Sequence, residues 1–179
     1  MIYRDGITEI VPLEDNEFFR NRFGWYQGWW NDPDVTRFTS HGQYPKSKRE
    51  LEEYLSINDN ADQIVWAILD TTEENHYWIG NVSLQQIDWQ NRSAEVAIII
   101  GLTKFNGRGH GTRVLTMVLD HARRKMGLHR VWAGTAQENQ GFQKAALRAG
   151  MTHEGRERQA MWCDGHWMSI EKFAKVWND

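Results

Sequence analysis

The feature that most constrains the fold is a glycine-rich segment that lies between an apolar run and an amphipathic run. Residues 96–100 read Val-Ala-Ile-Ile-Ile, which is typical of a central strand covered on both faces. Residues 106–112 read Asn-Gly-Arg-Gly-His-Gly-Thr. An apolar stripe at helical spacing follows, formed by Val114, Leu115, Val118, Leu119 and Ala122. The segment therefore predicts a buried strand, a glycine turn and a long helix in direct succession.

Such a turn can hold a pyrophosphate. Glycines let backbone N–H groups approach a ligand closely, and the start of a helix adds partial positive charge. The turn is not a P-loop, because Thr112 directly follows Gly111 with no lysine between them. It also lacks the third glycine of the dinucleotide fingerprint and lies late in the chain. On this segment alone, a purely structural glycine turn is the alternative.

The remaining hydrophobic pattern predicts further strands and helices. Strands are expected at residues 7–13, 63–70, 77–85, 92–102, 130–135, 151–159 and 166–173. Helices are expected at residues 14–30, 47–58 and 140–149, and between the glycine turn and Gly127. Asn31–Asp34 ends the first of these, and Ser47 with Glu50 forms a capping box that begins the second. The order β-α-α-β-β-β-α-β-α-β-β predicts an α+β protein with an antiparallel meander.

Composition limits the partners. With 179 residues, a net charge of −3 and 25% charged residues, the chain suits one domain over residues 1–179 and has no general attraction to nucleic acid or anionic membranes. Its longest uncharged apolar stretch, residues 96–102, is too short to span a bilayer. Cys163 stands alone, and no Cys/His pair has zinc-ligand spacing. We expect a soluble, cytoplasmic protein with no nucleic-acid, membrane or metal partner.

With the blocks around it, the glycine segment resembles the Arg/Gln-x-x-Gly-x-Gly/Ala signature of the GNAT acetyltransferases, although Asn106 stands where Arg or Gln is usual. Residues 30–35, Trp-Asn-Asp-Pro-Asp-Val, resemble an early block of the branch that contains ribosomal-protein N-terminal and amino-sugar acetyltransferases. Other blocks similar to the family, in order, are residues 94–101, 129–133, 138–139, 147–151 and 154–156. The resemblance implies a mixed, mostly antiparallel sheet of about seven strands, flanked by about four helices and split between its fourth and fifth strands.

The resemblance also implies a site for acetyl-CoA in that split. The main chain of Ile98, Ile99 and Ile100 would pair with the pantetheine arm. Asn139 matches the family's asparagine near the pantetheine and could equally be a helix N-cap. Lys144 could reach a phosphate or simply face solvent, and the same alternative holds for Arg108. The pyrophosphate would be held by Asn106, Gly107, Arg108, Gly109, His110, Gly111 and Thr112.

For the chemistry, the resemblance implies direct attack of an amine on the thioester. A primary amine of pKa about 10 is mostly protonated at neutral pH, so a base is needed. Glu95 is the candidate, because the family often uses an acid on this strand; a surface strand glutamate is the alternative. The family's usual proton donor to the departing thiolate is a tyrosine, but Ala146 occupies that position and no tyrosine follows Tyr77.

The acceptor is expected against an aromatic and acidic segment. Trp30, with Asp32 and Asp34 nearby, could stack on the acceptor and hold its protonated amine, although core and interface packing is the simpler explanation of the tryptophan. Protein N-termini and amino sugars are the leading acceptors and polyamines rank third. The protein would act as a monomer or homodimer. The alternative class is a non-catalytic GNAT-like module that senses acyl-CoA, which the missing tyrosine favours.

Overall fold

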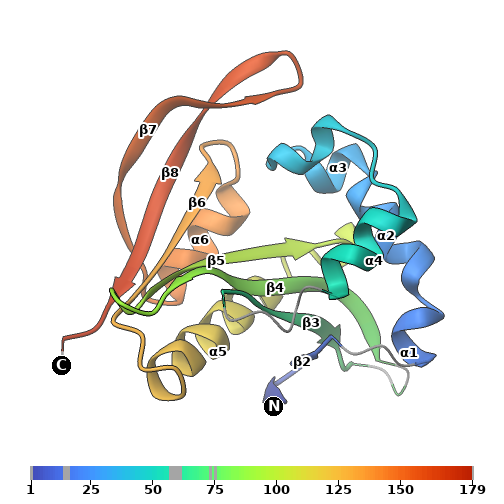
Figure 1. Ribbon diagram of the computed structural model, residues 1–179, viewed down its shortest axis with the longest axis horizontal. Coiled ribbons are helices and arrows are strands. Elements are labelled where there is room, and N and C mark those ends of the chain that lie inside the picture. Colours follow the sequence, from blue (N-terminus) through green and yellow to red (C-terminus); the bar gives the residue numbers. More distant parts are fainter. Residues whose placement is uncertain (1, 14–16, 57–61, 73, 75, 179) are drawn as a thin grey trace.

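The computed structural model describes residues 2–13, 17–56, 62–72, 74 and 76–178, which form a central sheet with helices around it (Figure 1). The eight strands lie in the order β1-β2-β3-β4-β5-β6-β8-β7. They are β1 (Tyr3–Asp5), β2 (Thr8–Pro12), β3 (Ile64–Asp70), β4 (Tyr77–Asp88), β5 (Ser93–Ile100), β6 (Arg130–Ala136), β7 (Thr152–Cys163) and β8 (His166–Val176). The helices are α1 (Glu17–Arg20), α2 (Phe23–Trp30), α3 (Pro33–Thr36), α4 (Lys48–Ser56), α5 (His110–Arg124) and α6 (Gln140–Arg148), with 3₁₀ turns η1 (Ser40–Gln43) and η3 (Thr103–Phe105).

The sheet splits in its middle. Neighbouring strands are antiparallel except β5 and β6, which run parallel and pair only over Ser93–Arg130, Ala94–Val131 and Glu95–Trp132. Beyond Glu95 the two strands diverge, and Figure 1 shows β6 rising away from β5. The predicted α+β class, the antiparallel meander and the split are therefore confirmed. The split lies between β5 and β6 because β1 adds one strand to the predicted order.

Two apolar layers hold the sheet. On one face, Ile68, Val82 and Val96 pack with the apolar stripe of α5. On the other face, Trp78 packs with aromatic residues of α1 and α2, including Tyr26, whose ring stacks on Trp78 at 5.2 Å. The alternation of strand residues between two covered faces explains the continuous apolar runs in the sequence.

The structure corrects several predicted elements. A short hairpin strand, β1, precedes the predicted first strand and was missed, because three residues carry too little pattern. The predicted helix over residues 14–30 is wrong as a single helix: α1 and α2 are separated at Asn21 and Arg22, while residues 14–16 lie outside the described part. Asp32 and Pro33 end one helix and begin another, since the Asp32 side chain caps α3.

The second predicted helix begins as expected. Glu50 Oε2 accepts from the Ser47 backbone N–H at 2.8 Å, and the Glu50 N–H donates to Ser47 Oγ at 3.2 Å. This reciprocal pair is the capping box that the sequence predicted. The helix is described to Ser56, and its predicted end near Asn58 lies outside the described residues.

The β7–β8 arm crosses from the sheet to the helical wall formed by α3 and η1. At its tip, Gln43 Nε2 donates to the Trp162 carbonyl at 2.9 Å, and Phe38 packs against the apolar cluster of Ala136, Cys163 and Met168. Figure 1 shows the arm arching toward α3. The two walls beside the split are thus joined at the arm tip. No helix in the described ranges is long and apolar enough to cross a membrane.

Candidate active site

A cleft of about 550 Å³ lies between the free end of β5, the start of α5, helix α6 and the α3–η1 wall. The cleft contains every predicted cofactor residue except Arg108, whose guanidinium lies over the Phe105 ring at 5.0 Å from its centroid. The sequence-predicted residues that line it are Ile98, Ile99, Ile100, Asn106, Gly107, Gly109, His110, Gly111, Thr112, Asn139 and Lys144. Residues separated by more than 40 positions in the chain therefore meet in one concave site.

The glycine turn leaves the start of α5 open. Gly107 and Gly109 have φ of 76° and 88°, left-handed conformations that favour glycine, and a Cβ built at either would meet nothing within 4 Å. No side chain caps α5, and its first turn contains no acidic residue. The first N–H groups of this helix thus have neither a capping side chain nor an acidic side chain of the first turn competing for them. This geometry fits a bound diphosphate.

The β5 edge is open beyond the split. Ile98, Ile99 and Ile100 pair with β4 on one side, but ladder pairing with β6 ends at Glu95. Alternate N–H and C=O groups on the β6 side therefore have no strand partner. An extended ligand with amide groups can add to this edge as a strand would.

Helix α6 supplies cationic side chains and a capped start. Lys144 and Arg148, one turn apart, both line the cleft. Asn139 Oδ1 accepts from the Phe142 N–H at 3.1 Å, so the N-cap interpretation of this residue is correct while the residue also lines the cleft. The sequence prediction missed Arg148, although its spacing from Lys144 is the signal that could have found it.

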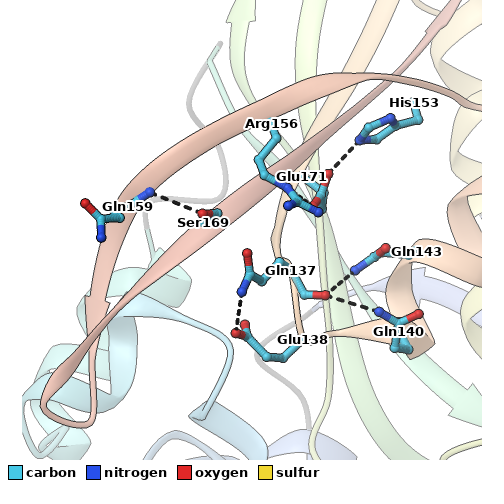
Figure 2. A network of polar contacts seen from close by, with 9 residues as sticks. All are labelled: Gln137, Glu138, Gln140, Gln143, His153, Arg156, Gln159, Ser169 and Glu171. Carbon is cyan, nitrogen blue, oxygen red and sulfur yellow. Dashed lines mark hydrogen bonds and ion pairs between the residues drawn. The ribbon is translucent and has the colours of Figure 1, made fainter.

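Glu138 is a second cleft residue that the sequence prediction did not assign. Gln137 Nε2 donates to Glu138 Oε1 at 2.9 Å, and the Gln137 carbonyl accepts from the amides of Gln140 and Gln143 at 3.2 and 2.8 Å (Figure 2). These bonds hold the β6–α6 junction and place a carboxylate on the cleft wall.

The side chain of His110 anchors the glycine turn to the sheet. The ring is 2% exposed, with Nδ1 lying 2.8 Å from Thr8 Oγ1 and Nε2 lying 3.1 Å from Asp70 Oδ2. Thr8 and Asp70 are themselves fully buried. The first residue of α5 is therefore hydrogen-bonded to β2 and lies against the Asp70 carboxylate of β3, a role that sequence reasoning missed.

We expect His110 to make the protein less stable in acid. Burial lowers the pKa of His110 below its ordinary value of 6.5. The unfolded state therefore binds the proton first, and stability falls as the pH drops from about 6.5 toward the folded-state pKa. Melting temperatures measured between pH 8 and 5 (roughly the span of histidine titration) should decline less steeply for His110→Gln, with the similarly depressed His121 unchanged in both proteins. Parallel pH curves would contradict this assignment.

Glu95 occupies the base of the split. It is the last β5 residue paired with β6, and its neighbours Ala94 and Val96 face the core with α5, so Glu95 faces the opposite side. Its Oε2 accepts from Gln85 Nε2 at 2.8 Å and from Gln86 Nε2 at 2.9 Å. The structure thus holds the predicted base beside the split, outside the residues that line the cleft.

The three predicted acceptor residues do not all line the cleft. Asp34 lines the cleft, whereas Asp32 Oδ1 caps α3 by accepting from the Asp34 N–H at 2.9 Å. Trp30 is half-buried and packs edge-on against Tyr26, with the ring centroids 6.0 Å apart. Neither Trp30 nor Asp32 lines the cleft.

The position of the expected tyrosine is apolar and closed. Ala146 lies on the buried side of α6, fully enclosed in the main hydrophobic core. A side-chain proton donor is therefore absent from this position.

Comparison with known proteins assigns this architecture. The family described as "Acetyltransferase (GNAT) domain" matches residues 19–152. A probable N-acetyltransferase, YjcK of Bacillus subtilis, is 30% identical over 133 residues, covering 73% of this chain and 68% of that protein. The spermidine N(1)-acetyltransferase of Vibrio cholerae is 27% identical over 125 residues, covering 69% of each.

Solved structures show the same fold. Spermidine N-acetyltransferase from Vibrio cholerae, in complex with CoA and spermine, superposes with a TM-score of 0.81 at 21% identity and 96% coverage of both chains. RimL, a ribosomal L7/L12 α-N-protein acetyltransferase in complex with CoA, superposes with a TM-score of 0.83 at 17% identity and 98% coverage of both chains. With the split sheet, the glycine turn and the family match in agreement, the chain belongs to the GNAT acetyltransferases.

Proposed function

We propose that this protein transfers an acetyl group from acetyl-CoA to the primary amine of a protein N-terminus or an amino sugar. One observation carries the proposal: the uncapped glycine turn of α5 and the open edge of β5 line the same cleft. A diphosphate and an amide-containing arm are thereby accommodated side by side. The CoA named in the structures of two neighbours supports the same donor.

The chain's own groups bind the donor. Backbone N–H groups of residues 107–112 hold the diphosphate, and Lys144 with Arg148 adds positive charge nearby. The edge of Ile98–Ile100 pairs with the pantetheine amides and fixes the thioester near the split. A backbone N–H of β5 beyond the split stabilises the charge that develops on the thioester oxygen.

The acetyl donor supplies a thioester carbonyl that an amine can attack. Glu95 accepts a proton from the attacking amine, directly or through one water, as the C–N bond forms and the C–S bond breaks. Because Ala146 offers no proton, the sulfur leaves as a thiolate and is protonated by solvent. A thiol of pKa about 8.5 is a tolerable leaving group for this route.

The acceptor enters between the α2–α3–η1 wall and the β7–β8 arm. The Gln43–Trp162 hydrogen bond and the Phe38 contact join these walls at the arm tip. Asp34 and Glu138 are the carboxylates among the residues that line the cleft, whereas a polycation would favour a denser acidic cluster. Spermidine, the substrate named for one relative, is therefore the third candidate.

A structure of the Vibrio cholerae spermidine N-acetyltransferase is described as dodecameric. A monomer or homodimer stays a prediction for this chain.

An acceptor screen tests this proposal. Acetyl-CoA turnover is measured with a peptide bearing a free N-terminus, with glucosamine and with spermidine. We expect the peptide or the amino sugar to stimulate turnover more than spermidine does. Preferential stimulation by spermidine would overturn the acceptor assignment, and no stimulation by any amine would overturn the proposed transfer.

The proposed acceptor wall extends beyond the cleft residues to Trp30. Trp30→Ala is therefore expected to raise the acceptor KM about five- to tenfold and to leave the acetyl-CoA KM unchanged, because one stacking contact is worth roughly 1 to 1.4 kcal/mol. Trp25→Ala is the matched control, since Trp25 lies on the same helix and is 47% exposed. Steady-state kinetics on both variants give the comparison. Equal acceptor KM values for Trp30→Ala and the wild-type protein would show that Trp30 only packs the helix.

A further inference from the structure

We propose that Gln85 and Gln86 are positioning residues that hold the Glu95 carboxylate for proton transfer. This inference rests on the proposed role of Glu95 as the base. Both side-chain amides donate to the same oxygen, Oε2, at 2.8 and 2.9 Å. The structure gives Oε1 no hydrogen-bond partner among the described residues, so Oε1 is the oxygen that accepts the amine proton.

A hydrogen bond from Ser83 orients the side-chain amide of Gln85. It is the antiparallel register partner of Glu95, so the two side chains share one face of the sheet. Ser83 Oγ, two residues away on the same face, donates to Gln85 Oε1 at 3.4 Å. With its oxygen occupied by a donor, Gln85 presents its NH₂ group to Glu95. A polar chain of Ser83, Gln85 and Glu95 therefore runs along this face of the sheet.

Gln86 reaches the same carboxylate only because the strand is irregular. Successive residues of a strand point to opposite faces, so Gln85 and Gln86 could not both bind Glu95 in a regular β4. The register shifts between Gln85 and Asp88, and Gln86 adopts φ of 50°. This left-handed conformation is unfavourable for a glutamine, whereas glycine adopts it freely. A bulge that re-aims a side chain beside a proposed active site is the arrangement expected of a functional constraint.

The double donation has a chemical consequence. Two donors on Oε2 restrict rotation of the carboxyl group. The other oxygen, Oε1, is therefore held in one orientation. Proton transfer depends on hydrogen-bond distance between the base and the amine or its water, so a carboxylate free to rotate is a poorer base. The glutamines touch no reacting atom in this scheme and act through Glu95.

Gln86→Gly separates positioning from folding. The substitution removes the amide but suits the left-handed backbone, so the melting temperature should be unchanged or higher. We expect kcat to fall about tenfold, with the acetyl-CoA KM unchanged. The loss should shrink as the pH rises, because more of the amine is already deprotonated. Gln85→Leu should lower kcat in the same direction.

Gln159→Gly is the matched control. Gln159 also lies in a bulge, with φ of 49°, but its exposed side chain stands on β7, which β6 and β8 separate from β5 and Glu95 in the sheet. Its backbone N–H donates to Ser169 Oγ at 3.2 Å (Figure 2). Relief of backbone strain should be similar there. Because Gln159 lies on the arm beside the proposed acceptor entrance, the variants are compared by pH dependence: any change in the kcat of Gln159→Gly should not shrink as the pH rises. A wild-type kcat in both Gln86→Gly and Gln85→Leu would overturn the positioning role.

The Glu95→Gln background distinguishes the role of Glu95 as the base from the positioning role of the glutamines. If Glu95→Gln lowers kcat and Gln86→Gly lowers it no further in that background, the glutamine acts through Glu95. If Glu95→Gln lowers kcat but loss of the glutamines has no effect in the wild-type background, the base stands and the positioning role fails. A Glu95→Gln variant with full activity removes the base itself and the inference with it.

Discussion

Gly109→Asp should abolish the rise in melting temperature that CoA gives the wild-type protein. A ligand at a hundredfold excess over its Kd stabilises the folded state by about 2.7 kcal/mol, and for a chain of this size that corresponds to a rise of roughly 5 to 10 °C. Aspartate at this position places a carboxylate where the diphosphate binds and strains a backbone with φ of 88°. Gly111→Asp should also abolish the shift, with less backbone strain. Thermal denaturation with and without CoA measures both.

Gly127→Asp is the control at the other end of the same helix. Gly127 follows the end of α5 with φ of 67°, and a Cβ there would also meet nothing within 4 Å. The variant should lose stability through backbone strain and keep the full CoA shift. If all three variants shift as the wild-type protein does, the diphosphate binds elsewhere.

Glu95→Gln should lower kcat about 100-fold with little change in acetyl-CoA affinity, because the amide cannot accept the amine proton. The loss should diminish toward the pKa of the acceptor amine, which is about 8 for the α-amine of a protein N-terminus. Steady-state kinetics across pH test both statements. A wild-type kcat at neutral pH would leave Glu95 as a strand residue only.

The fold was predictable where the sequence carries long periodic patterns. The apolar run over residues 96–100 and the apolar stripe of α5 are each long enough to show their periodicity. The type and order of these elements therefore followed from residue spacing. Strand β1 and the break at Asn21–Arg22 involve a few residues each, and tertiary contacts decide them. Gly24 and Gly28 weaken helix α2 locally, a signal that could have suggested a broken segment.

The cofactor cleft was predictable from the resemblance, whereas its supporting contacts were not. The environment of His110 depends on Thr8 and Asp70, which lie far from it in the sequence and meet it only in the folded sheet. The bulge at Gln86 leaves no mark in the pattern of residue types, because glutamine does not favour φ of 50°. The following Pro33 could have indicated that Asp32 is a helix N-cap. Capping occupies the Asp32 side chain and so competes with acceptor binding.

The most direct test of the account is acceptor-dependent release of CoA, measured together with the acetylated product. Purified protein is incubated with acetyl-CoA, with and without the amine that stimulates turnover most. We expect that CoA release rises with the acceptor, that each CoA released matches one acetyl group found on the amine nitrogen, and that Gly109→Asp loses the activity. Binding of acetyl-CoA with thioester loss that is slow and identical with every acceptor would contradict catalysis and support a module that only senses acyl-CoA.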